Sequence, residues 1–493
     1  MTEAQRIDGL IAAAPRDAVA LVHRDREITF GALDAMVAQV AGGLVAAGVR
    51  PGDRVVTWLP KSIESVVALF AASRAGAVFV PANPQLKAAQ VEHIVSDSGA
   101  VLLLTSRSRS AGLDVAANVL TLEDDWGRLS GADPASMAVS ADDLAALLYT
   151  SGSTGRPKGV MLSHRNLWLA ADSVRQFLGT SPDDRVLSVL PHGFDYGLNQ
   201  LTSAWAGGAR AVLLDYLTPR DVVRAVERHR ITQLAGVPPL WQSLAATDWG
   251  LAGASLRVLT NSGGHVHPGL SEKLRTLFPA ARLYLMYGLT EAFRATYLDP
   301  ALVDSHPESV GRAIPHAEVL VLRPDGSVTA DDEPGELVQS GPLVAQGYWH
   351  DDERTAQRFR PAPAASVHEG MAVWSGDTMR RDAAGLHYFV GRDDEMIKTS
   401  GHRVSPTEIE DAALASGAVS GAAAFGRPDE LLGQTVVLIA SKQGEDAEAR
   451  LRQALSTQLP GYMQPSSIVW LDAMPVNANG KLDRAALRRD HAR

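Results

Sequence analysis

The sequence predicts an α/β protein: a large N-terminal region of layered α/β subdomains, a β-rich subdomain, and a small, mobile α+β C-terminal domain. Apolar helical patterns alternate with short Val/Leu-rich runs up to about residue 260, strands separated by Pro/Gly turns follow, and the pattern resets after residue 393. Helices alternating with apolar strands are typical of parallel sheets. We expect the core over residues 1–393, with its β-rich part at about 309–390, and the mobile domain over 394–493.

The first part of the chain supplies the alternating elements in order. Residues 33–47 and 64–75 have the apolar spacing of helices, while residues 54–59 and 77–81 are short apolar runs that end at turn residues. Further strands are expected at residues 185–190, 211–214, 233–237, 256–260 and 282–286. Residues 114–138 have the weakest pattern, and we expect a surface excursion there.

From about residue 309 the alternation of helices and apolar strands gives way to short strands separated by turns. Strands expected at residues 318–322 and 336–339 are separated by Pro-Asp-Gly and Glu-Pro-Gly turns, which indicates a β-rich subdomain. The last hundred residues, from near Ile397, alternate helical and strand patterns on a smaller scale. We therefore place the main domain boundary just before Asp394.

Composition excludes several classes of protein. The 493 residues are 46% hydrophobic and 21% charged, as in ordinary globular proteins. A net charge of −10 disfavours nonspecific electrostatic binding to nucleic acid or to an anionic membrane. The absence of cysteine removes disulfides, thiolate metal sites and cysteine nucleophiles. The N-terminus lacks the pattern of a signal peptide and the most apolar stretch is interrupted by Arg74, so we expect a cytoplasmic protein without a membrane segment.

A Ser/Thr/Gly-rich stretch follows the apolar run at residues 144–148. Glycines let the backbone approach an anion, N–H and hydroxyl groups can surround phosphate oxygens, and a lysine adds charge. The candidate phosphate-binding residues are Thr150, Ser151, Gly152, Ser153, Thr154, Gly155 and Lys158. Because Pro157 precedes the lysine and Gly159 follows it, the stretch departs from the P-loop pattern, and in isolation it is also typical of a polar surface loop.

Further motifs accompany this loop in a fixed order. They are Tyr287-Gly288-Leu289-Thr290-Glu291, Gly335-Glu336-Leu337, Ser375-Gly376-Asp377, the segment from Gly391 to Lys398, and Asn479-Gly480-Lys481. As a set, the motifs resemble the adenylate-forming superfamily, which includes acyl-CoA synthetases, luciferases and the adenylation domains of peptide synthetases. The resemblance implies an AMP-forming ligase: a carboxylate is joined to the α-phosphate of ATP, pyrophosphate leaves, and the acyl group passes to a second nucleophile.

The resemblance also implies how the nucleotide is held. The carboxylate of Glu291 would help to hold Mg²⁺ against the phosphates, since a hard ion prefers oxygen ligands. The remaining nucleotide-binding residues would be Tyr287 (adenine stacking), Gly288, Thr290 (phosphate), Asp377 (ribose hydroxyls) and Arg392 (ribose). Leu285 stands where amino-acid-activating relatives carry an adenine-contacting asparagine, so backbone groups at Gly263 and Gly264 are the expected substitute.

Two lysines resemble the catalytic lysines of the family. Lys481 matches the lysine that bridges the carboxylate and α-phosphate oxygens during adenylation, where charge develops in the transition state. Lys398, close to Gly401, belongs to the loop that the family presents in the second half-reaction. Asp394 matches the hinge about which the small domain rotates between the two steps.

Phe194-Asp195 resembles the motif whose aspartate pairs with the substrate ammonium in amino-acid-activating members. A carboxylate buried at the mouth of an acyl pocket is costly without a partner, which favours an aminated substrate, although a structural ion pair would also explain it. Counting from the motifs places the substrate-binding residues at Asp195, Tyr196, Asn199, Gly236, Ser262, Met286 and Arg294, with Thr260 and Ala295 beside them. Large side chains favour a small amino acid, whereas pairing of Arg294 with a substrate carboxylate would predict an acidic one.

The same segments also bear on which molecule accepts the activated acyl group. The segments around Phe194 and Tyr287 resemble free-standing adenylation enzymes that serve acyl carrier proteins, as in the biosynthesis of macrolactam antibiotics. No carrier domain follows Lys481, so we expect a carrier protein in trans, offering either a phosphopantetheine thiol or the amine of a loaded aminoacyl group. An acyl-CoA ligase for a non-amino acid is the alternative, because it needs the same nucleotide residues.

Overall fold

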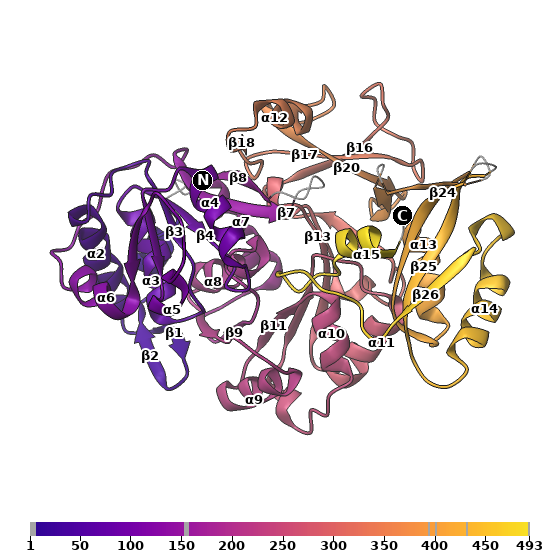
Figure 1. The fold of residues 1–493 in the computed structure, drawn as a ribbon, viewed down its shortest axis with the longest axis horizontal. Coiled ribbons are helices and arrows are strands. Elements are labelled where there is room, and N and C mark those ends of the chain that lie inside the picture. Colours follow the sequence, from indigo (N-terminus) through magenta and orange to yellow (C-terminus); the bar gives the residue numbers. More distant parts are fainter. Residues whose placement is uncertain (1–5, 152–156, 393–394, 400–401, 430–431, 492–493) are drawn as a thin grey trace.

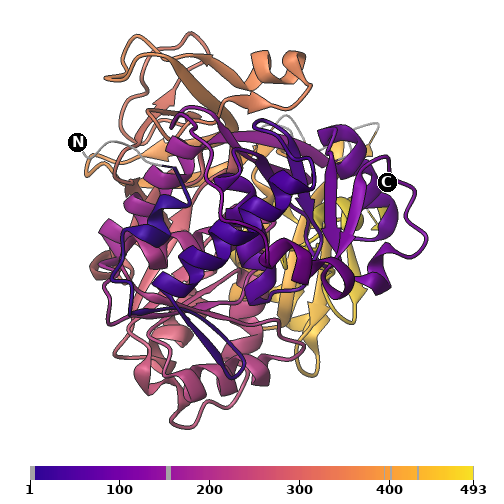
Figure 2. The same ribbon diagram turned by 90° about the vertical axis from the view of Figure 1, so that its left-hand side faces the viewer.

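The computed structural model describes residues 6–151, 157–392, 395–399, 402–429 and 432–491 (Figure 1). The chain forms a mixed α/β fold with a large N-terminal part and a smaller C-terminal part at opposite ends of the long axis, which confirms the predicted fold class. Figure 2, turned by 90°, places the N-terminal helices in front and the C-terminal strands behind. The predicted boundary at residues 393–394 lies outside the described residues.

The first layered unit is built on a seven-stranded sheet in the order β18-β8-β7-β4-β3-β5-β6. β7, β4, β3, β5 and β6 run parallel, and β8 and β18 are antiparallel additions. Its strands are β3 (Arg54–Thr57), β4 (Val78–Pro81), β5 (Leu102–Thr105), β6 (Asn118–Thr121), β7 (Leu144–Ser151), β8 (Pro157–Ser163) and β18 (Gly347–Tyr348). The helices of this part of the chain are α1 (Gly9–Ala12), α2 (Phe30–Ala46), α3 (Ile63–Arg74), α4 (Ala88–Ser98), α5 (Arg107–Ser110), α6 (Leu122–Ser130) and α7 (His164–Leu178).

The second sheet continues from a parallel half into an antiparallel half. Its order is β16-β17-β20-β21-β15-β14-β13-β12-β11-β9-β10-β1-β2, with β19 beside β20. The layered half contains β1 (Val19–His23), β2 (Arg26–Thr29), β9 (Arg185–Ser188), β10 (Arg210–Leu213), β11 (Gln233–Gly236), β12 (Val258–Asn261) and β13 (Arg282–Tyr287), with α8 (Asp195–Ala206), α9 (Pro219–His229), α10 (Pro238–Ala245), η1 (Ala252–Ser255) and α11 (Pro268–Leu277). The β-rich half contains β14 (Thr296–Leu298), β15 (Ser309–Ala313), β16 (Glu318–Leu322), β17 (Gly335–Ser340), β19 (Phe359–Pro361), β20 (Met371–Arg381) and β21 (His387–Arg392), with η2 (Thr290–Ala292), η3 (Pro300–Leu302) and α12 (Asp352–Arg358).

The C-terminal part has its own core. A three-stranded sheet in the order β24-β25-β26 packs with α13 and α14, and a two-stranded β22-β23 ribbon precedes it. The elements are β22 (Ile397–Thr399), β23 (His402–Val404), α13 (Pro406–Ala415), β24 (Val419–Asp429), β25 (Gly433–Lys442), α14 (Ala447–Gln458), η4 (Gly461–Met463), β26 (Ser467–Leu471) and α15 (Arg484–His491). The loop before α15 extends back toward α8 (Figure 1).

The expected surface excursion at residues 114–138 is wrong in part, because β6 and α6 lie within it. Thr121 caps α6 by accepting a bond from the amide of Asp124, and the buried Leu129 packs against α2. Two glycines on α2 make room for this segment: a Cβ on Gly43 would lie 2.4 Å from the Leu129 carbonyl oxygen, and one on Gly42 would collide with the backbone of Asp133. These contacts join residues far apart in the chain, so the sequence alone does not show that the segment packs against α2.

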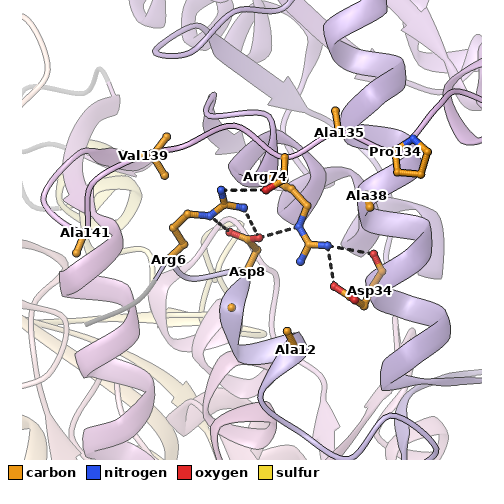
Figure 3. A pocket seen from close by; sticks show the side chains of 12 residues that line it. Arg6, Asp8, Ala12, Asp34, Ala38, Arg74, Pro134, Ala135, Val139 and Ala141 are labelled. Atoms are coloured by element: carbon orange, nitrogen blue, oxygen red, sulfur yellow. Dashed lines mark hydrogen bonds and ion pairs between the residues drawn. The ribbon is translucent and has the colours of Figure 1, made fainter. Parts of the chain in front are cut away.

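A buried charge network fixes the described start of the chain (Figure 3). Asp8, which is 2% exposed, pairs with Arg6 at 2.6 Å and with Arg74 of α3 at 2.8 Å, and Arg74 reaches Asp34 at 2.7 Å. Burial raises the pKa of Asp8, but the two arginines outweigh it and hold the pKa below its ordinary value. The neighbouring cavity of about 650 Å³ is therefore lined by charges that already pair with one another.

Direct contacts join the two parts of the chain. The side-chain amide of Asn83, after β4, donates to the carbonyl of Ala478 at 2.8 Å and to Oδ1 of Asn479 at 2.9 Å. His265 and Asp411 of α13 form a second contact at 3.4 Å. Among the described residues, no helix is both long and apolar enough to cross a membrane.

Candidate active site

The carboxyl ends of β9, β11, β12 and β13 meet at one edge of the parallel half-sheet. Gly236 pairs with Asn261 and Asn261 with Leu285, so the three strands end side by side. Open α/β sheets bind ligands at this edge because the loops that follow the strands converge there. The predicted residues at or just beyond these ends are Asp195, Tyr196, Gly236, Ser262, Gly263, Gly264, Met286, Tyr287, Gly288, Thr290 and Glu291.

Lys158 and Glu291 form a buried ion pair beside the predicted phosphate loop. The Nζ of Lys158 lies 3.2 Å from Oε1 of Glu291 and 2.8 Å from the hydroxyl of Tyr348, which itself donates to the same Oε1 at 2.6 Å. Burial raises the pKa of Glu291, but Lys158 and Tyr348 outweigh burial and hold the pKa below its ordinary value. Burial also lowers the pKa of Lys158, and Glu291 opposes that shift. The carboxylate is thus ionised and can serve as a cation ligand.

The ribose side of the predicted site joins three strands. Tyr287, at the end of β13, donates its hydroxyl to the carboxylate of Asp377 on β20. Asp377 pairs in register with Arg392 on β21, which brings the two predicted ribose residues together at the level of the backbone. Ser375 supports this position, because its hydroxyl accepts a bond from the amide of Asp377 at 3.0 Å.

Asp195 opens α8 with its side chain in the protein interior. It is 5% exposed, and its Oδ1 has no hydrogen-bond partner among the described residues. Burial raises its pKa above the ordinary value, although the positive charges of Arg294 and Lys481 act in the opposite direction. A buried carboxylate with an open acceptor position is expected to bind a positively charged or hydrogen-bond-donating group.

The predicted substrate pocket encloses a cavity of about 30 Å³. Its lining includes Tyr196, Asn199, Thr260, Met286 and Arg294, and the hydroxyls of Tyr196 and Thr260 lie 2.6 Å apart. Gly236 does not widen this cavity. A Cβ at that position would lie 2.8 Å from the ring of Trp241, so the glycine makes room for the indole. A cavity above roughly 10–15 Å³ holds a water, so the remaining space suits a small group.

A strained turn aims Arg294 into this pocket. Phe293 has φ 65° and ψ −65°, and the amide of Arg294 donates to the carbonyl of Ala292 at 2.8 Å, which together form a γ-turn that a side chain disfavours. Phe293 is 1% exposed, and the buried Gln339 donates to the carbonyl of Arg294 at 2.9 Å, so packing holds the turn. Gly288 permits the approach, since a Cβ there would lie 2.8 Å from Cα of Arg294.

Lys481 reaches this edge from the C-terminal part. Its Nζ lies 4.2 Å from the centre of the Phe194 ring, and a Cβ on Gly263 would lie 2.5 Å from its Cε. The Asn477–Lys481 turn is closed by a bond of 2.7 Å from the amide of Asn477 to the carbonyl of Lys481. The lysine therefore lies between the loop that precedes Asp195 and the glycine loop after β12.

Some predicted residues are placed only in part. Gly152, Ser153, Thr154, Gly155 and Asp394 lie outside the described residues. Ser151 on β7, Arg392 on β21 and Lys398 on β22 are placed by their strands alone. Thr150 pairs in register with Lys158, and its buried Oγ1 has no partner within the described part of the chain.

Sequence reasoning missed Tyr348, Asn83 and Phe194 as contributors to the site. Tyr348 is 2% exposed and reaches Glu291 from β18, and Asn83 holds the turn that carries Lys481. The contacts of Tyr348 and Asn83 join residues far apart in the chain, so no local spacing reveals them. Phe194 was named only as part of the motif at Asp195, although an aromatic residue beside that position is a signal for a cation–π contact.

Replacement of Asn83 by alanine is expected to lower the rate of the first half-reaction about tenfold, since the loss of hydrogen bonds worth about 1–1.5 kcal/mol loosens the Lys481 turn. ATP–pyrophosphate exchange measures the effect. The exposed Asn118 of β6, replaced by alanine, is the matched control. Equal rates for both variants would contradict a positioning role for Asn83.

Comparisons with known proteins agree with this geometry. The AMP-binding enzyme family matches residues 11–349, and the AMP-binding enzyme C-terminal domain matches residues 408–481. A feruloyl-CoA synthase from Amycolatopsis sp. is 35% identical over 484 residues, which cover 96% of each chain. The phosphinothricin tripeptide synthetase PhsC of Streptomyces viridochromogenes is also 35% identical over 485 residues, 96% of this chain but 44% of that protein.

Solved structures support the same family assignment. The Bacillus subtilis o-succinylbenzoate coenzyme A synthetase, in complex with ATP and magnesium ion, superposes with a TM-score of 0.87 at 26% identity over 98% of this chain and 99% of that one. ATP and magnesium are typical of such enzymes. The chain belongs to the AMP-binding enzyme family, within the adenylate-forming superfamily, and is an AMP-forming ligase that activates a carboxylic acid by ATP-dependent adenylation.

Proposed function

We propose that this ligase activates an amino acid and transfers it to an acceptor held on a carrier protein. In the first step a carboxylate oxygen bonds to the α-phosphorus of ATP, the bond to the β-phosphate oxygen breaks, and pyrophosphate leaves. In the second step a thiol or amine of the acceptor attacks the acyl carbon, AMP leaves, and the acceptor loses its proton. The two steps give an aminoacyl thioester or an amide.

The observation that carries the proposal is the buried carboxylate of Asp195. Its Oδ1 is open among the described residues, it lies next to the pocket residue Tyr196, and no ion pair to it occurs within the described part of the chain. A substrate ammonium would supply both the charge and the donor that this position lacks. A fatty or aryl acid would leave the carboxylate unpaired.

The other residues then have defined tasks. Lys481 would stabilise the charge that develops on the carboxylate and α-phosphate oxygens, while Asp377 and Arg392 would hold the ribose. Glu291 fits a magnesium ligand because it is ionised and its hydrogen bonds from described residues end on one oxygen, Oε1. Magnesium would neutralise charge on the triphosphate. Lys398 and a rotation about Asp394 are proposed for the transfer step.

The carrier protein is supported by the resemblance to free-standing adenylation enzymes and by the likeness to a peptide synthetase, of which this chain spans less than half. We further propose that the enzyme serves the biosynthesis of a macrolactam antibiotic. The acceptor can be tested directly, because hydroxylamine would release an aminoacyl hydroxamate if the phosphopantetheine thiol is the acceptor. It would release a dipeptidyl hydroxamate, with the new amide intact, if the amine of a loaded aminoacyl group is the acceptor.

A second candidate is an acyl-CoA ligase for a non-amino acid. The feruloyl-CoA synthase likeness, which extends over nearly the whole of both chains, favours it. An aromatic acyl group would, however, need space that Tyr196, Met286 and Arg294 fill, since the cavity between them is about 30 Å³.

ATP–pyrophosphate exchange over amino acids, their deaminated analogues and ferulate separates the two candidates. We expect exchange with an amino acid, and a loss of about 100-fold in kcat/KM for Asp195→Asn, because the amide retains the shape but not the charge. The KM for the amino acid should rise as the pH falls through the raised pKa of Asp195, since only the carboxylate binds the ammonium.

The exposed Asp183, replaced by asparagine, provides the matched control and should keep the activity of the parent. The asparagine variant at position 195 should also lose the acid-side change in KM. Exchange with ferulate or another unaminated acid, unaffected by Asp195→Asn, would refute the proposal and favour the CoA ligase.

A further inference from the structure

The Arg294 guanidinium is buried with most of its hydrogen-bonding capacity unused. It is 2% exposed, its Nη1 donates to the hydroxyl of Ser262 at 2.8 Å, and its face lies on the Tyr196 ring, with Cζ 4.5 Å from the ring centre. Its Nε and Nη2 have no hydrogen-bond partner among the described residues. A guanidinium carries five N–H donors and remains charged in proteins, so this one lacks acceptors.

The opposite charge nearby does not complete the pair. Asp195 acts on Arg294 electrostatically, yet no ion pair joins them within 4.0 Å in the described structure, and each leaves a polar atom open. A structural ion pair would have closed both positions. Arg294 in the pocket lining therefore offers a charged donor, and Asp195, next to the lining residue Tyr196, offers an acceptor. Each can take a group of opposite charge from a ligand.

Arg294 cannot readily move to solvent. The γ-turn at Phe293 fixes its backbone, Gln339 holds its carbonyl, and the Tyr196 ring that it covers is tied to Thr260 at 2.6 Å. Arg294 also lines the cavity of about 30 Å³, together with Met286. The residue that carries the open N–H groups is thus both held in place and part of the lining of a small cavity.

We infer that Arg294, positioned by Ser262 and Tyr196, binds a second carboxylate of the substrate, so that the substrate is a short amino dicarboxylic acid of the aspartate type. This inference rests on the proposed function, in which Asp195 takes the ammonium. One carboxylate is adenylated and the other meets the guanidinium, whose planar fork suits carboxylate oxygens. The cavity of about 30 Å³ leaves room for only a small polar group beside Arg294, which favours a short side chain between the two carboxylates.

The inference is tested by exchange assays with aspartate, asparagine, alanine, glutamate and succinate. Aspartate should exceed asparagine by at least about 100-fold in kcat/KM, because the neutral amide leaves a buried charge unpaired. Arg294→Gln should remove that preference and improve asparagine relative to aspartate, which a merely structural arginine would not do. Arg220→Gln, on the exposed surface of α9, should change neither value.

Different results would contradict the role of Asp195 and the role of Arg294. Equal use of succinate and aspartate would remove the role of Asp195 in amine binding, while preference of the parent enzyme for alanine or asparagine over aspartate would remove the role of Arg294. If Arg294→Gln does not fold, the substrate ranking of the parent enzyme still decides, and Arg294→Lys, which keeps the charge without the fork, should retain part of the aspartate preference.

Discussion

Replacement of Lys481 by alanine is expected to lower acyl-adenylate formation by about 100- to 1,000-fold while ATP still binds. The lysine extends from the C-terminal part to a position 4.2 Å from the Phe194 ring centre, beside Gly263 and within electrostatic reach of Asp195. A cation there acts mainly on charge that develops during the reaction, so its loss affects the rate of the step more than the affinity for ATP. ATP–pyrophosphate exchange measures the rate, and calorimetry measures nucleotide binding.

The second half-reaction provides the control within the same variant. With a synthetic aminoacyl-adenylate supplied, transfer to the acceptor should proceed at nearly the rate of the parent, because Lys481 is assigned to the first step. Lys273→Ala, on the exposed face of α11, is the matched control for removal of a lysine. Unchanged exchange in Lys481→Ala would remove this lysine from the adenylation step.

Replacement of Glu291 by glutamine is expected to reduce exchange by at least about 100-fold and to raise the magnesium concentration required for half-maximal rate. The amide keeps a hydrogen bond for Tyr348 but withdraws the negative charge that pairs with Lys158 at 3.2 Å. Leaving Lys158 largely buried without that charge should also cost roughly 1–3 kcal/mol of folding stability. Magnesium titration of the exchange rate and thermal unfolding measure the two effects.

Glu353→Gln, on the exposed surface of α12, is the matched control for removal of a carboxylate. The stability difference between Glu291→Gln and the parent should shrink as the pH falls. The pKa of Glu291 lies below its ordinary value, so the parent's advantage is present above that value and is lost as the carboxylate protonates. A variant with the magnesium dependence and melting temperature of the parent would contradict both roles.

The fold and the centre of the site could be predicted because their signals are local. Strands such as β11 and β13 are apolar runs flanked by turns, and parallel pairing brings the residues after them to one edge. The order of the motifs also assigns Asp195, Glu291 and Lys481 to one expected site, through the superfamily that the motifs resemble.

The remaining contacts depend on packing between distant segments. Tyr348 reaches Glu291 across 57 positions of the chain, and Asn83 reaches Asn479 across 396. The helix α6 buries Leu129, and its close approach to α2 depends on the glycines of α2. No periodicity encodes such partners, since they exist only after the sheets have assembled.

The γ-turn at Phe293 has a consequence for how the two ligands influence each other. Glu291 and Arg294 stand on either side of it, and the buried Phe293 packs the turn between them into the core. In the proposed function Glu291 would face the triphosphate and Arg294 the acid. We expect that a small displacement of the turn on binding of the acid would be transmitted to Glu291. Thermodynamic linkage makes this heterotropic effect mutual: the factor by which the acid alters ATP affinity equals the factor by which ATP alters acid affinity.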